Sequence, residues 1–575
     1  MQSFRSSVLA LAAGCAAALA FAPLGLWPVG LAGLAVLVHL VVTANRALQA
    51  ARRGLVFGVG MFAVSLNWIA KSFTFQANMP PELGWVAVSG LALYLALFVA
   101  APAGLAAALV KKPVARTLML AGLWAPAEAL RGTLLTGFAW NPLGAMWLGT
   151  PVAQMASVVG GAGLSLLALA CGAALLWLVR GPTRWLRLSG GGIIAATGVL
   201  ALIGGGFITE TAYIGAPLVM VQPGIGQSER YDAGAAERHL ATYIAMTRAA
   251  LAQVAQAGRP VLQNADVAQR ALTETEGVAS PLLPSADKVT GELRNKVAPG
   301  IADPMPEQTS GGAALLPRRP TLVLWPEGAI DDLIEVDPAA RARVGAAIGA
   351  GDLLLAGGTG VSRREDGSAR YANSLFVIAG GGRIVERYDK SHLVPMGEYV
   401  PWRQWLEPLG IARFVPGDFD FAQGIGPRTL VLPGFTSVSP MICYEIAFPQ
   451  SVTDRNNRPG WIANVSNDAW FGTWGPPQHL AQARLRAIEE GLPIVRATPT
   501  GISAVIDGFG RVRVSLGLGK KDVIITTLPP PQPETLFARL GMYPVALLAL
   551  LAAVAALMID RHTSSRTARP GSRGA

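Results

Sequence analysis

Three short segments of the sequence carry side chains that together are suited to acyl transfer. The first is a strand-like run that ends in Trp-Pro and the carboxylate of Glu327. The second presents an amine, Lys390, and the third is an apolar run that ends at the thiol of Cys443 and is followed by polar residues. Strand ends in α/β sheets are where reactive groups are usually presented. The three segments are therefore the candidates for a catalytic site.

The residue types indicate how the three groups would divide the chemistry. A free thiol has a pKa of about 8.5 and is mostly protonated at neutral pH. A carboxylate can accept that proton, and a nearby ammonium favours the thiolate and, with a backbone N–H, stabilises the oxyanion of an acyl-transfer intermediate. We therefore expect Cys443 to be the nucleophile, Glu327 the general base, and Lys390 the group that stabilises the thiolate and the oxyanion.

The composition excludes a purely soluble protein. Of the 575 residues, 52% are hydrophobic and only 14% are charged, against about 25% charged in average soluble domains. Three cysteines are too few for a disulfide framework or a Cys-rich zinc site. Five histidines without a metal-ligand spacing argue against a catalytic metal.

The apolar residues are concentrated in stretches that approach the roughly 20 residues needed to span a bilayer. These stretches cover residues 7–22, 26–43, 54–70, 85–110, 117–130, 158–179 and 191–208, and one more covers 541–559. The one at 117–130 is short and interrupted by Pro126 and Glu128. We expect a bundle of about seven transmembrane helices over residues 1–209, a last one at 541–559 and a basic cytoplasmic tail at 560–575.

Lys and Arg in the connections between these stretches predict the orientation of the bundle. With a cytoplasmic amino terminus, one side of the membrane holds Arg5, Arg46, Arg52, Arg53, Lys111, Lys112, Arg116, Arg180, Arg184, Arg187, Arg561, Arg566, Arg569 and Arg573. The opposite short loops hold only Lys71 and Arg131. This places residues 209–540 outside the cytoplasm. The net charge of +11 then reflects topology and contact with anionic lipids, and no nucleic-acid partner is expected.

Residues 210–535 have the pattern of an α/β sandwich domain. Short β-branched runs alternate with turns and with helical stretches at 235–256 and 480–490. The expected strands are Pro217–Gln222, Thr321–Trp325, Leu353–Gly357, Ser374–Ala379, Thr436–Cys443, Trp461–Ser466, Ser503–Asp507 and Val523–Thr527. Between about 258 and 320 the periodicity fades and prolines accumulate, so we expect a flexible insertion there.

The residues around the three candidate groups resemble the carbon–nitrogen hydrolase (nitrilase) superfamily, whose members use Glu, Lys and Cys in this chain order. The matching runs are Trp325-Pro326-Glu327, Tyr388-Asp389-Lys390, Leu393-Val394-Pro395, Gly397-Glu398-Tyr399-Val400-Pro401, Ile442-Cys443-Tyr444-Glu445, Ser466–Gly472, Gln478-His479, Arg486–Glu489 and Arg496-Ala497-Thr498. Together with the apolar bundle and the loop Thr136–Asn141, the chain is similar over nearly its whole length to the apolipoprotein N-acyltransferase family. That resemblance implies a multi-span α-helical membrane bundle carrying an extracytoplasmic nitrilase-like α/β/β/α sandwich domain.

The same resemblance implies an activity and its partners. Cys443 would take a fatty acyl chain from the sn-1 ester of a phospholipid as a thioester. It would then pass the chain to the α-amino group of the diacylglyceryl-cysteine of an apolipoprotein. The implied location is the bacterial cytoplasmic (inner) membrane, with the catalytic domain on the periplasmic side and in contact with membrane lipids. No cofactor is implied.

The resemblance also assigns supporting residues. Glu398 would position Lys390, the backbone N–H of Tyr444 or Glu445 would help hold the oxyanion, and Glu445 would support the site. Candidates for substrate binding are Trp140, Tyr231, Trp470 and Phe471.

Two other functions remain open from the residues alone. A membrane-tethered amidase or hydrolase of the nitrilase type would use the same three groups, with water as the second nucleophile. A transporter with an extracytoplasmic domain would need buried charge inside its spans. Glu128 is the main candidate for such a charge, and pairing with Arg131 explains it equally well.

Overall fold

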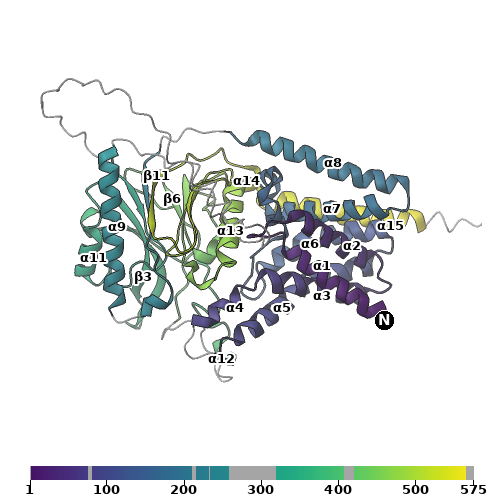
Figure 1. The fold of residues 1–575 in the computed structure, drawn as a ribbon, viewed down its shortest axis with the longest axis horizontal. Helices are drawn as coiled ribbons and strands as arrows, with labels where there is room; N and C mark the ends of the chain where they lie inside the picture. Colours follow the sequence, from purple (N-terminus) through teal and green to yellow (C-terminus); the bar gives the residue numbers. More distant parts are fainter. Residues whose placement is uncertain are drawn as a thin grey trace, which may run out of the picture.

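The computed structural model describes residues 2–75, 80–209, 215–231, 234–257, 319–406 and 420–564. A bundle of helices lies at one end of its long axis and two β-sheets lie at the other (Figure 1). Of the insertion expected at 258–320, residues 258–318 lie outside the described residues, as does the tail beyond Ser564.

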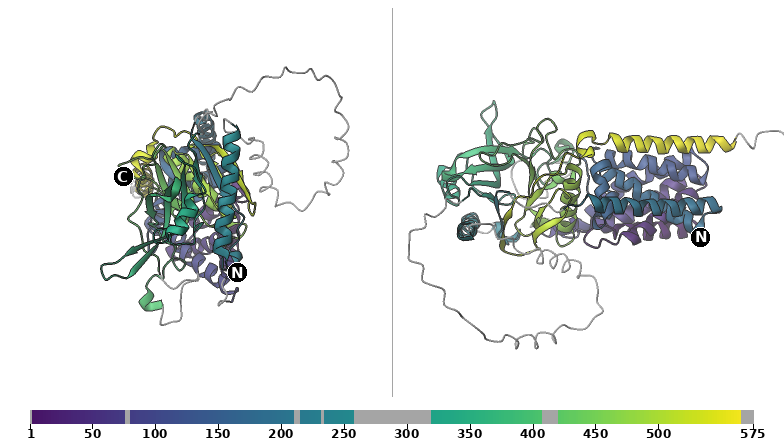
Figure 2. Two further views of the ribbon diagram at one scale, coloured as in Figure 1. Left: turned by 90° about the vertical axis from the view of Figure 1, so that its left-hand side faces the viewer. Right: turned by 90° about the horizontal axis from the view of Figure 1, so that it is seen from above.

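The bundle consists of apolar helices rich in alanine, leucine and glycine. They are α1 (Gln2–Ala18), α2 (Trp27–Val42), α3 (Ala47–Ser65), α4 (Ile69–Ser72), α5 (Leu83–Leu109), α6 (Pro113–Arg131), α7 (Ala156–Arg180) and α8 (Arg184–Phe207), joined by α15 (Tyr543–Ser564) from the carboxyl end of the chain. Small residues bring the helices close: a Cβ on Gly58 of α3 would lie 2.8 Å from Ala96 of α5. Figure 2 shows α15 alongside the bundle, where Ala549 packs against Ala125 of α6.

Every apolar stretch expected from the sequence overlaps a helix. Two details differ from the expectation. The third stretch is not one helix to residue 70, because α3 and the segment Ile69–Phe75 meet at a bend of 50°. Pro126 does not interrupt α6. By length and composition, four helices of the described chain are able to cross a membrane, or five if the bent pair is counted, while Phe4–Ala18 and Trp27–Val42 are apolar but shorter. These helices are those of a membrane protein.

The other half of the chain contains two β-sheets. The first has the order β11-β1-β2-β3-β4-β5 and the second the order β10-β9-β8-β7-β6. The strands are β1 (Pro217–Gln222), β2 (Leu322–Leu324), β3 (Leu353–Arg363), β4 (Ala369–Ala379), β5 (Ile384–Asp389), β6 (Val438–Ile442), β7 (Trp461–Val465), β8 (Ile494–Ala497), β9 (Ser503–Ile506), β10 (Val512–Leu516) and β11 (Asp522–Thr527). Each sheet contains three neighbouring parallel strands, β1–β2–β3 in the first and β6–β7–β8 in the second.

Three apolar cores define the layers of this half. One core lies between the sheets and joins residues such as Met220 of β1 to Ile442 of β6. The second lies between the first sheet and the helices α9 (Ala235–Ala257) and α11 (Pro338–Gly345). The third packs α13 (Gly475–Glu490) on the second sheet. The order is therefore helix, sheet, sheet, helix; the short helices α12 (Arg403–Leu406) and α14 (Leu536–Leu540) lie outside these layers.

All eight strands expected from the sequence are present, but β5, β8 and β10 were not predicted. Strands β5 and β10 lie at sheet edges and are mostly half-buried, so polar residues interrupt the continuous apolar run that marks a strand buried on both faces. Strand β8 contains Arg496, which is fully buried. A charge inside a central strand hides the apolar run by which such strands are recognised.

The two halves meet where α7 is broken near its start. Gly160 has a φ of +64° inside α7, and a Cβ at this position would lie 2.2 Å from the ring of Phe537 in α14. At the next residue, the backbone N–H of Gly161 donates to Glu489 of α13 at 2.7 Å. Gly160 thus allows α13 and α14 to pack against the start of α7.

Replacing Gly160 by alanine is expected to destabilise this junction. The substitution forces a Cβ into the Phe537 ring and strains a positive φ, and backbone strain of this kind costs about 1–3 kcal/mol. The melting temperature of the detergent-solubilised protein should fall by several degrees. Gly192→Ala in α8 is the matched control, since a Cβ there meets nothing within 4 Å. Equal melting temperatures for the two variants would contradict the role given to Gly160.

Candidate active site

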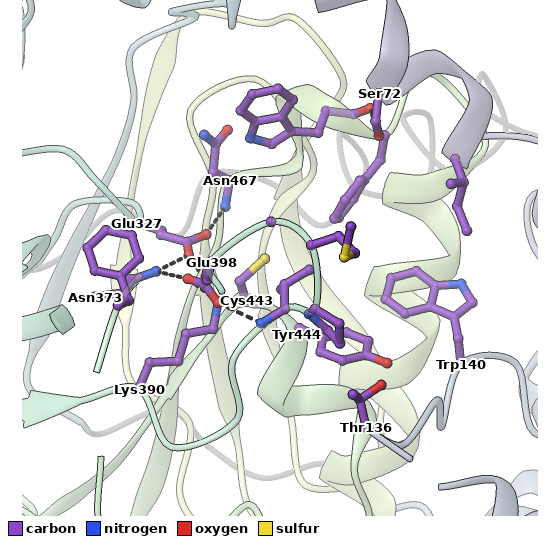
Figure 3. Close-up of a pocket in the computed structure, with 18 of the residues that line it drawn as sticks. Ser72, Thr136, Trp140, Glu327, Asn373, Lys390, Glu398, Cys443, Tyr444 and Asn467 are labelled. Atoms are coloured by element: carbon purple, nitrogen blue, oxygen red, sulfur yellow. Dashed lines mark hydrogen bonds and ion pairs between the residues drawn. The ribbon is translucent and has the colours of Figure 1, made fainter. Parts of the chain in front are cut away.

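The three groups expected to carry the chemistry lie together at the ends of strands from both sheets. Glu327 follows β2, Lys390 directly follows β5, and Cys443 directly follows β6. Figure 3 shows the three side chains converging on one side of a cavity. They approach one another because the carboxyl ends of β2 and β6 face each other across the core between the sheets.

Lys390 lies between two carboxylates. Its Nζ is 3.4 Å from Oε1 of Glu327 and 3.0 Å from the carboxylate of Glu398. The lysine side chain is only 1% exposed. Burial alone would lower the pKa of Lys390, but Glu398 and Glu327 outweigh this effect and raise it above its ordinary value. Lys390 is therefore an ammonium at physiological pH and cannot act as the base.

Asn373 of β4 bridges the same two carboxylates, and sequence reasoning missed it. Its Nδ2 donates to Oε1 of Glu327 at 2.8 Å and to Oε1 of Glu398 at 2.6 Å. Its backbone carbonyl oxygen accepts from the backbone N–H of Lys390 at 2.8 Å. Asn373 thus holds both acids with its side chain and the backbone of the lysine with its own backbone. The only sequence signal was a pair of polar residues, Asn373 and Ser374, directly before the apolar run of β4.

Glu327 is held ready to accept a proton. Its second oxygen, Oε2, accepts from the backbone N–H of Asn467 at 2.7 Å. Burial would raise the pKa of Glu327, but the charge of Lys390 and hydrogen bonds from Asn373, Asn467 and the Cys443 thiol together lower it below its ordinary value. Glu327 is consequently a carboxylate at neutral pH, as a general base must be.

Cys443 sits on a strained turn at the end of β6. Its φ is +53°, in the left-handed region that residues other than glycine rarely adopt, and such strain is typical of functional positions. Burial raises the pKa of the Cys443 thiol well above its ordinary value, Glu327 raises it further, and Lys390 opposes this. The resting group is therefore a thiol, and it must lose its proton to Glu327 as it attacks.

A buried polar network holds the backbone of this turn. Nε2 of His479 lies 3.0 Å from the carbonyl oxygen of Cys443, and its Nδ1 lies 2.9 Å from Oδ1 of Asp468. Arg496 pairs with the other oxygen of Asp468 at 2.5 Å. Burial would raise the pKa of Asp468, but Arg496 and His479 hold it well below its ordinary value. The side chain of His479 thus contacts the nucleophilic residue at the backbone carbonyl of Cys443.

Glu445 connects the cysteine turn to the lysine loop. Its Oε1 accepts from Tyr388 Oη at 2.8 Å and from the backbone N–H and the hydroxyl of Ser391 at 2.6 and 2.7 Å. Its Oε2 accepts from the backbone N–H of Ile442 at 2.7 Å. Glu445 is 2% exposed and does not line the cavity; these contacts make it a residue that positions Lys390 relative to Cys443.

The cavity in front of Cys443 has a volume of about 700 Å³. One wall belongs to the α/β half and includes Glu327, Lys390 and Cys443. The opposite wall belongs to the helical half and includes Ile69 of α4 and Leu91 of α5. Apolar side chains from both halves therefore enclose the space beside the thiol.

Three of the four residues expected to bind substrate line this cavity. Trp140, Trp470 and Phe471 line it, as does Tyr444, whose hydroxyl donates to the carbonyl oxygen of Gly137 at 3.2 Å. Tyr231 ends the short helix η4 (Ser228–Tyr231), and its side chain lies outside the described part of the chain. Trp140 and Tyr444 are stacked, with ring centroids 6.4 Å apart.

Glu128 and Arg131 interact electrostatically, and each side chain also binds the loop that follows. Glu128 accepts from the backbone N–H of Leu143 at 2.8 Å, and Arg131 donates to the carbonyl oxygen of Trp140 at 2.8 Å. Glu128 and Arg131 thus hold the loop that carries Trp140. Within the described residues, no group of three or more His, Cys, Asp and Glu side chains is placed to hold a metal ion.

Comparisons with known proteins give the same division of the chain. Residues 13–174 match the family model of the apolipoprotein N-acyltransferase N-terminal domain, and residues 319–534 match that of the carbon–nitrogen hydrolases. An amidase from Nesterenkonia sp. is a similar solved structure, with 21% identity, a TM-score of 0.26, and coverage of 36% of this chain and 77% of that one. The match to the family model identifies residues 319–534 as a carbon–nitrogen hydrolase domain.

Relatives over the full length define the protein more narrowly. Apolipoprotein N-acyltransferase of Rhodopseudomonas palustris is 34% identical over 98% of this chain and 96% of its own length. That of Bradyrhizobium diazoefficiens is also 34% identical, with the same coverage of both chains. The chain belongs to the apolipoprotein N-acyltransferase family and is an acyltransferase.

The pKa shifts predict a resting thiol that resists alkylation. Because burial and Glu327 raise the pKa of Cys443, its reaction with iodoacetamide should be slow at pH 7 and should increase only above the ordinary thiol range of about 8.5. Because the pKa of Glu327 is lowered, acyl transfer should persist down to about pH 5, where an ordinary Glu is still ionised. Peptide mass spectrometry locates the alkylated residue.

The Glu327→Gln variant tests the sign of this coupling. Removing the neighbouring charge lowers the pKa of Cys443, so alkylation at a given pH should be faster, while acyl transfer is lost. Rapid alkylation of Cys443 at pH 7 in the unsubstituted enzyme would contradict the arrangement.

Replacing Asn373 by alanine should impair catalysis without unfolding the protein. The two carboxylates lose their common donor, so Glu327 is no longer aligned with the thiol, and misalignment of this kind costs on the order of 100-fold in rate. The rate of acyl transfer and the melting temperature are the measurements. Asn456→Ala, at an exposed position, is the control; a rate for Asn373→Ala equal to that of the control would remove Asn373 from the site.

Proposed function

We propose that this chain moves a fatty acyl chain from a phospholipid, through a thioester on Cys443, to the α-amino group of the diacylglyceryl-cysteine of apolipoproteins. The observation that carries this proposal is the cavity of about 700 Å³, which is shared by the catalytic groups and by apolar helices α4 and α5. A lipid chain that lies among the helices can reach the thiol without crossing water. A soluble amide substrate has no need of such a wall.

The first half of the reaction forms the thioester. Cys443 Sγ attacks the carbonyl carbon of the sn-1 ester while its proton passes to Glu327. The ammonium of Lys390 stabilises the oxyanion, together with a backbone N–H of the turn Tyr444–Glu445. As the intermediate collapses, the C–O bond breaks, and Glu327 returns the proton to the leaving oxygen of the lysophospholipid.

The second half transfers the acyl chain to nitrogen. The neutral α-amine of the acceptor attacks the thioester carbonyl, and its extra proton passes to Glu327. The C–S bond then breaks, and the departing sulfur takes the proton back to become the thiol. Lys390 stays protonated throughout, held by Glu398 and Asn373, so a single base serves both halves.

We further propose that the chain is a multi-pass protein of the bacterial inner membrane, with its catalytic domain on the periplasmic side. The domains would be the bundle at 1–209, the catalytic domain at 210–535, the last transmembrane helix at 541–559 and a cytoplasmic tail at 560–575. Contacts between the end of α15 and the turn between α5 and α6 support the proposal that the basic residues of both segments lie on the same side of the membrane. Backbone N–H groups of Lys111 and Lys112 both donate to Asp560 at 2.9 Å.

Mass spectrometry of the intact protein after incubation with phospholipid tests the donor and the nucleophile together. We expect a mass increment of one fatty acyl group, located on Cys443 by peptide analysis. Cys443→Ala should give none, and Cys443→Ser should lose most activity because its hydroxyl is much harder to ionise. Cys15→Ala should behave as the unsubstituted enzyme. An acyl group found only on Cys15 or Cys171 would exclude Cys443.

Product analysis separates the acyltransferase from a membrane-tethered hydrolase. With phospholipid and a diacylglyceryl peptide, the proposal requires N-acylated peptide and lysophospholipid in equal amounts. Free fatty acid formed at the same rate with and without the peptide would instead identify a hydrolase.

A further inference from the structure

A glutamine of the α/β half holds the aromatic wall of the helical half. Gln478 lies in α13 and is completely buried. Its Oε1 accepts from Nε1 of Trp68 at 3.2 Å and from Nε1 of Trp140 at 2.9 Å. It also accepts from Nδ2 of Asn141 at 2.9 Å. All three donors come from the helical half of the chain.

The same side chain also binds the bend between α3 and α4. Nε2 of Gln478 donates to the carbonyl oxygen of Ser65 at 3.0 Å. Ser65 is the last residue of α3, where carbonyl oxygens have no partner within the helix. Trp68 directly precedes α4 and lies in the break where the chain bends by 50°. Gln478 therefore fixes both the bend and the indole within it.

Two indole N–H groups that meet at one oxygen constrain the orientation of both rings. The ring centroids of Trp68 and Trp140 are 5.1 Å apart, and Phe471 packs edge-on against Trp68 at 4.6 Å. All three residues line the cavity. Trp140 in turn stacks on Tyr444, the neighbour of the nucleophile. The cluster of Trp68, Trp140 and Phe471 is thus an aromatic part of the wall that is connected to the turn of Cys443 through Tyr444.

We propose that Gln478 is a positioning residue that sets the acyl-chain selectivity of the enzyme by fixing Trp68 and Trp140. It does not line the cavity and acts through the two indoles. Its hydrogen bonds hold the rings at one distance from the thiol, so that an ester carbonyl reaches Cys443 only when the adjoining chain fits along them. This inference rests on the proposed function, because it takes a lipid acyl chain as the occupant of the cavity.

The chain offers a matched control one helical turn away. Gln482 is also completely buried in α13, but its side-chain oxygen and nitrogen have no hydrogen-bond partner in the described structure. Methionine has a similar length and is tolerated in packed interiors. Gln478→Met removes four hydrogen bonds, whereas Gln482→Met removes none that the structure contains.

The test measures acyl-enzyme formation on Cys443 with phosphatidyl donors of short, medium and long acyl chains. For Gln478→Met we expect KM for the preferred donor to rise by about tenfold, the cost of about 1.4 kcal/mol in binding, with kcat changed much less. The preference among chain lengths should flatten. Gln482→Met should keep the KM, the kcat and the preference of the unsubstituted enzyme.

A second variant separates the loss of these hydrogen bonds from a loss of folding. Trp140→Phe keeps an aromatic ring but lacks the N–H that Gln478 accepts, and it should flatten the preference in the same direction. Melting temperatures show whether each variant is folded. A Gln478→Met enzyme that retains its chain-length preference, or that loses kcat equally for every donor at unchanged KM, would overturn the inference.

The two proposals fail in different ways. If the unsubstituted enzyme forms no acyl-enzyme with any phosphatidyl donor, the proposed function fails. If it does, but Gln478→Met shows the same preference, only the role of Gln478 is wrong.

Discussion

The active site depends on one buried cation placed between two carboxylates. Lys390 is almost inaccessible to solvent, and Glu327 and Glu398 lie on either side of it. Removing one member of a buried ion pair leaves an uncompensated charge and costs about 3–5 kcal/mol. The charges therefore keep each other in place, and Asn373, donating to both acids, sets the distance between them. This network explains how a base that is ionised at neutral pH and a thiol that is protonated can stand side by side.

The two halves of the molecule form one catalytic unit. The α/β half supplies the reactive groups, whereas the helical half supplies much of the surface that encloses the substrate. Contacts at several points hold them together: Gln478 on the indoles, Tyr444 on the carbonyl oxygen of Gly137, and Glu489 on the start of α7. Each is a buried polar contact with defined geometry. Because such contacts tolerate little displacement, the position of the aromatic wall relative to the Cys443 thiol is fixed.

The sequence predicted what is local and missed what depends on packing. Glu327, Lys390 and Cys443 each end or follow a strand, so the pattern of a few neighbouring residues was enough to single them out. The layers of the α/β half followed from alternating strands and helices. By contrast, Asn373 meets Glu398 only because β4 lies beside the lysine loop, and Gln478 meets Trp140 across 338 positions of the chain. No local pattern records a contact of that kind. The bend after Ser65 was missed for the same reason, since its partner lies in another domain.

Burial of the nucleophile has a consequence for its chemical durability. Oxidants and disulfides react with thiolates rather than thiols, and the resting sulfur of Cys443 is protonated and only 6% exposed. The periplasm, where we propose the catalytic domain lies, is an oxidising environment. A site that generates its thiolate only while an ester carbonyl is present would leave little of the reactive form available between turnovers. The same geometry that makes the sulfur depend on Glu327 would thus protect it from becoming a sulfenic acid or a mixed disulfide.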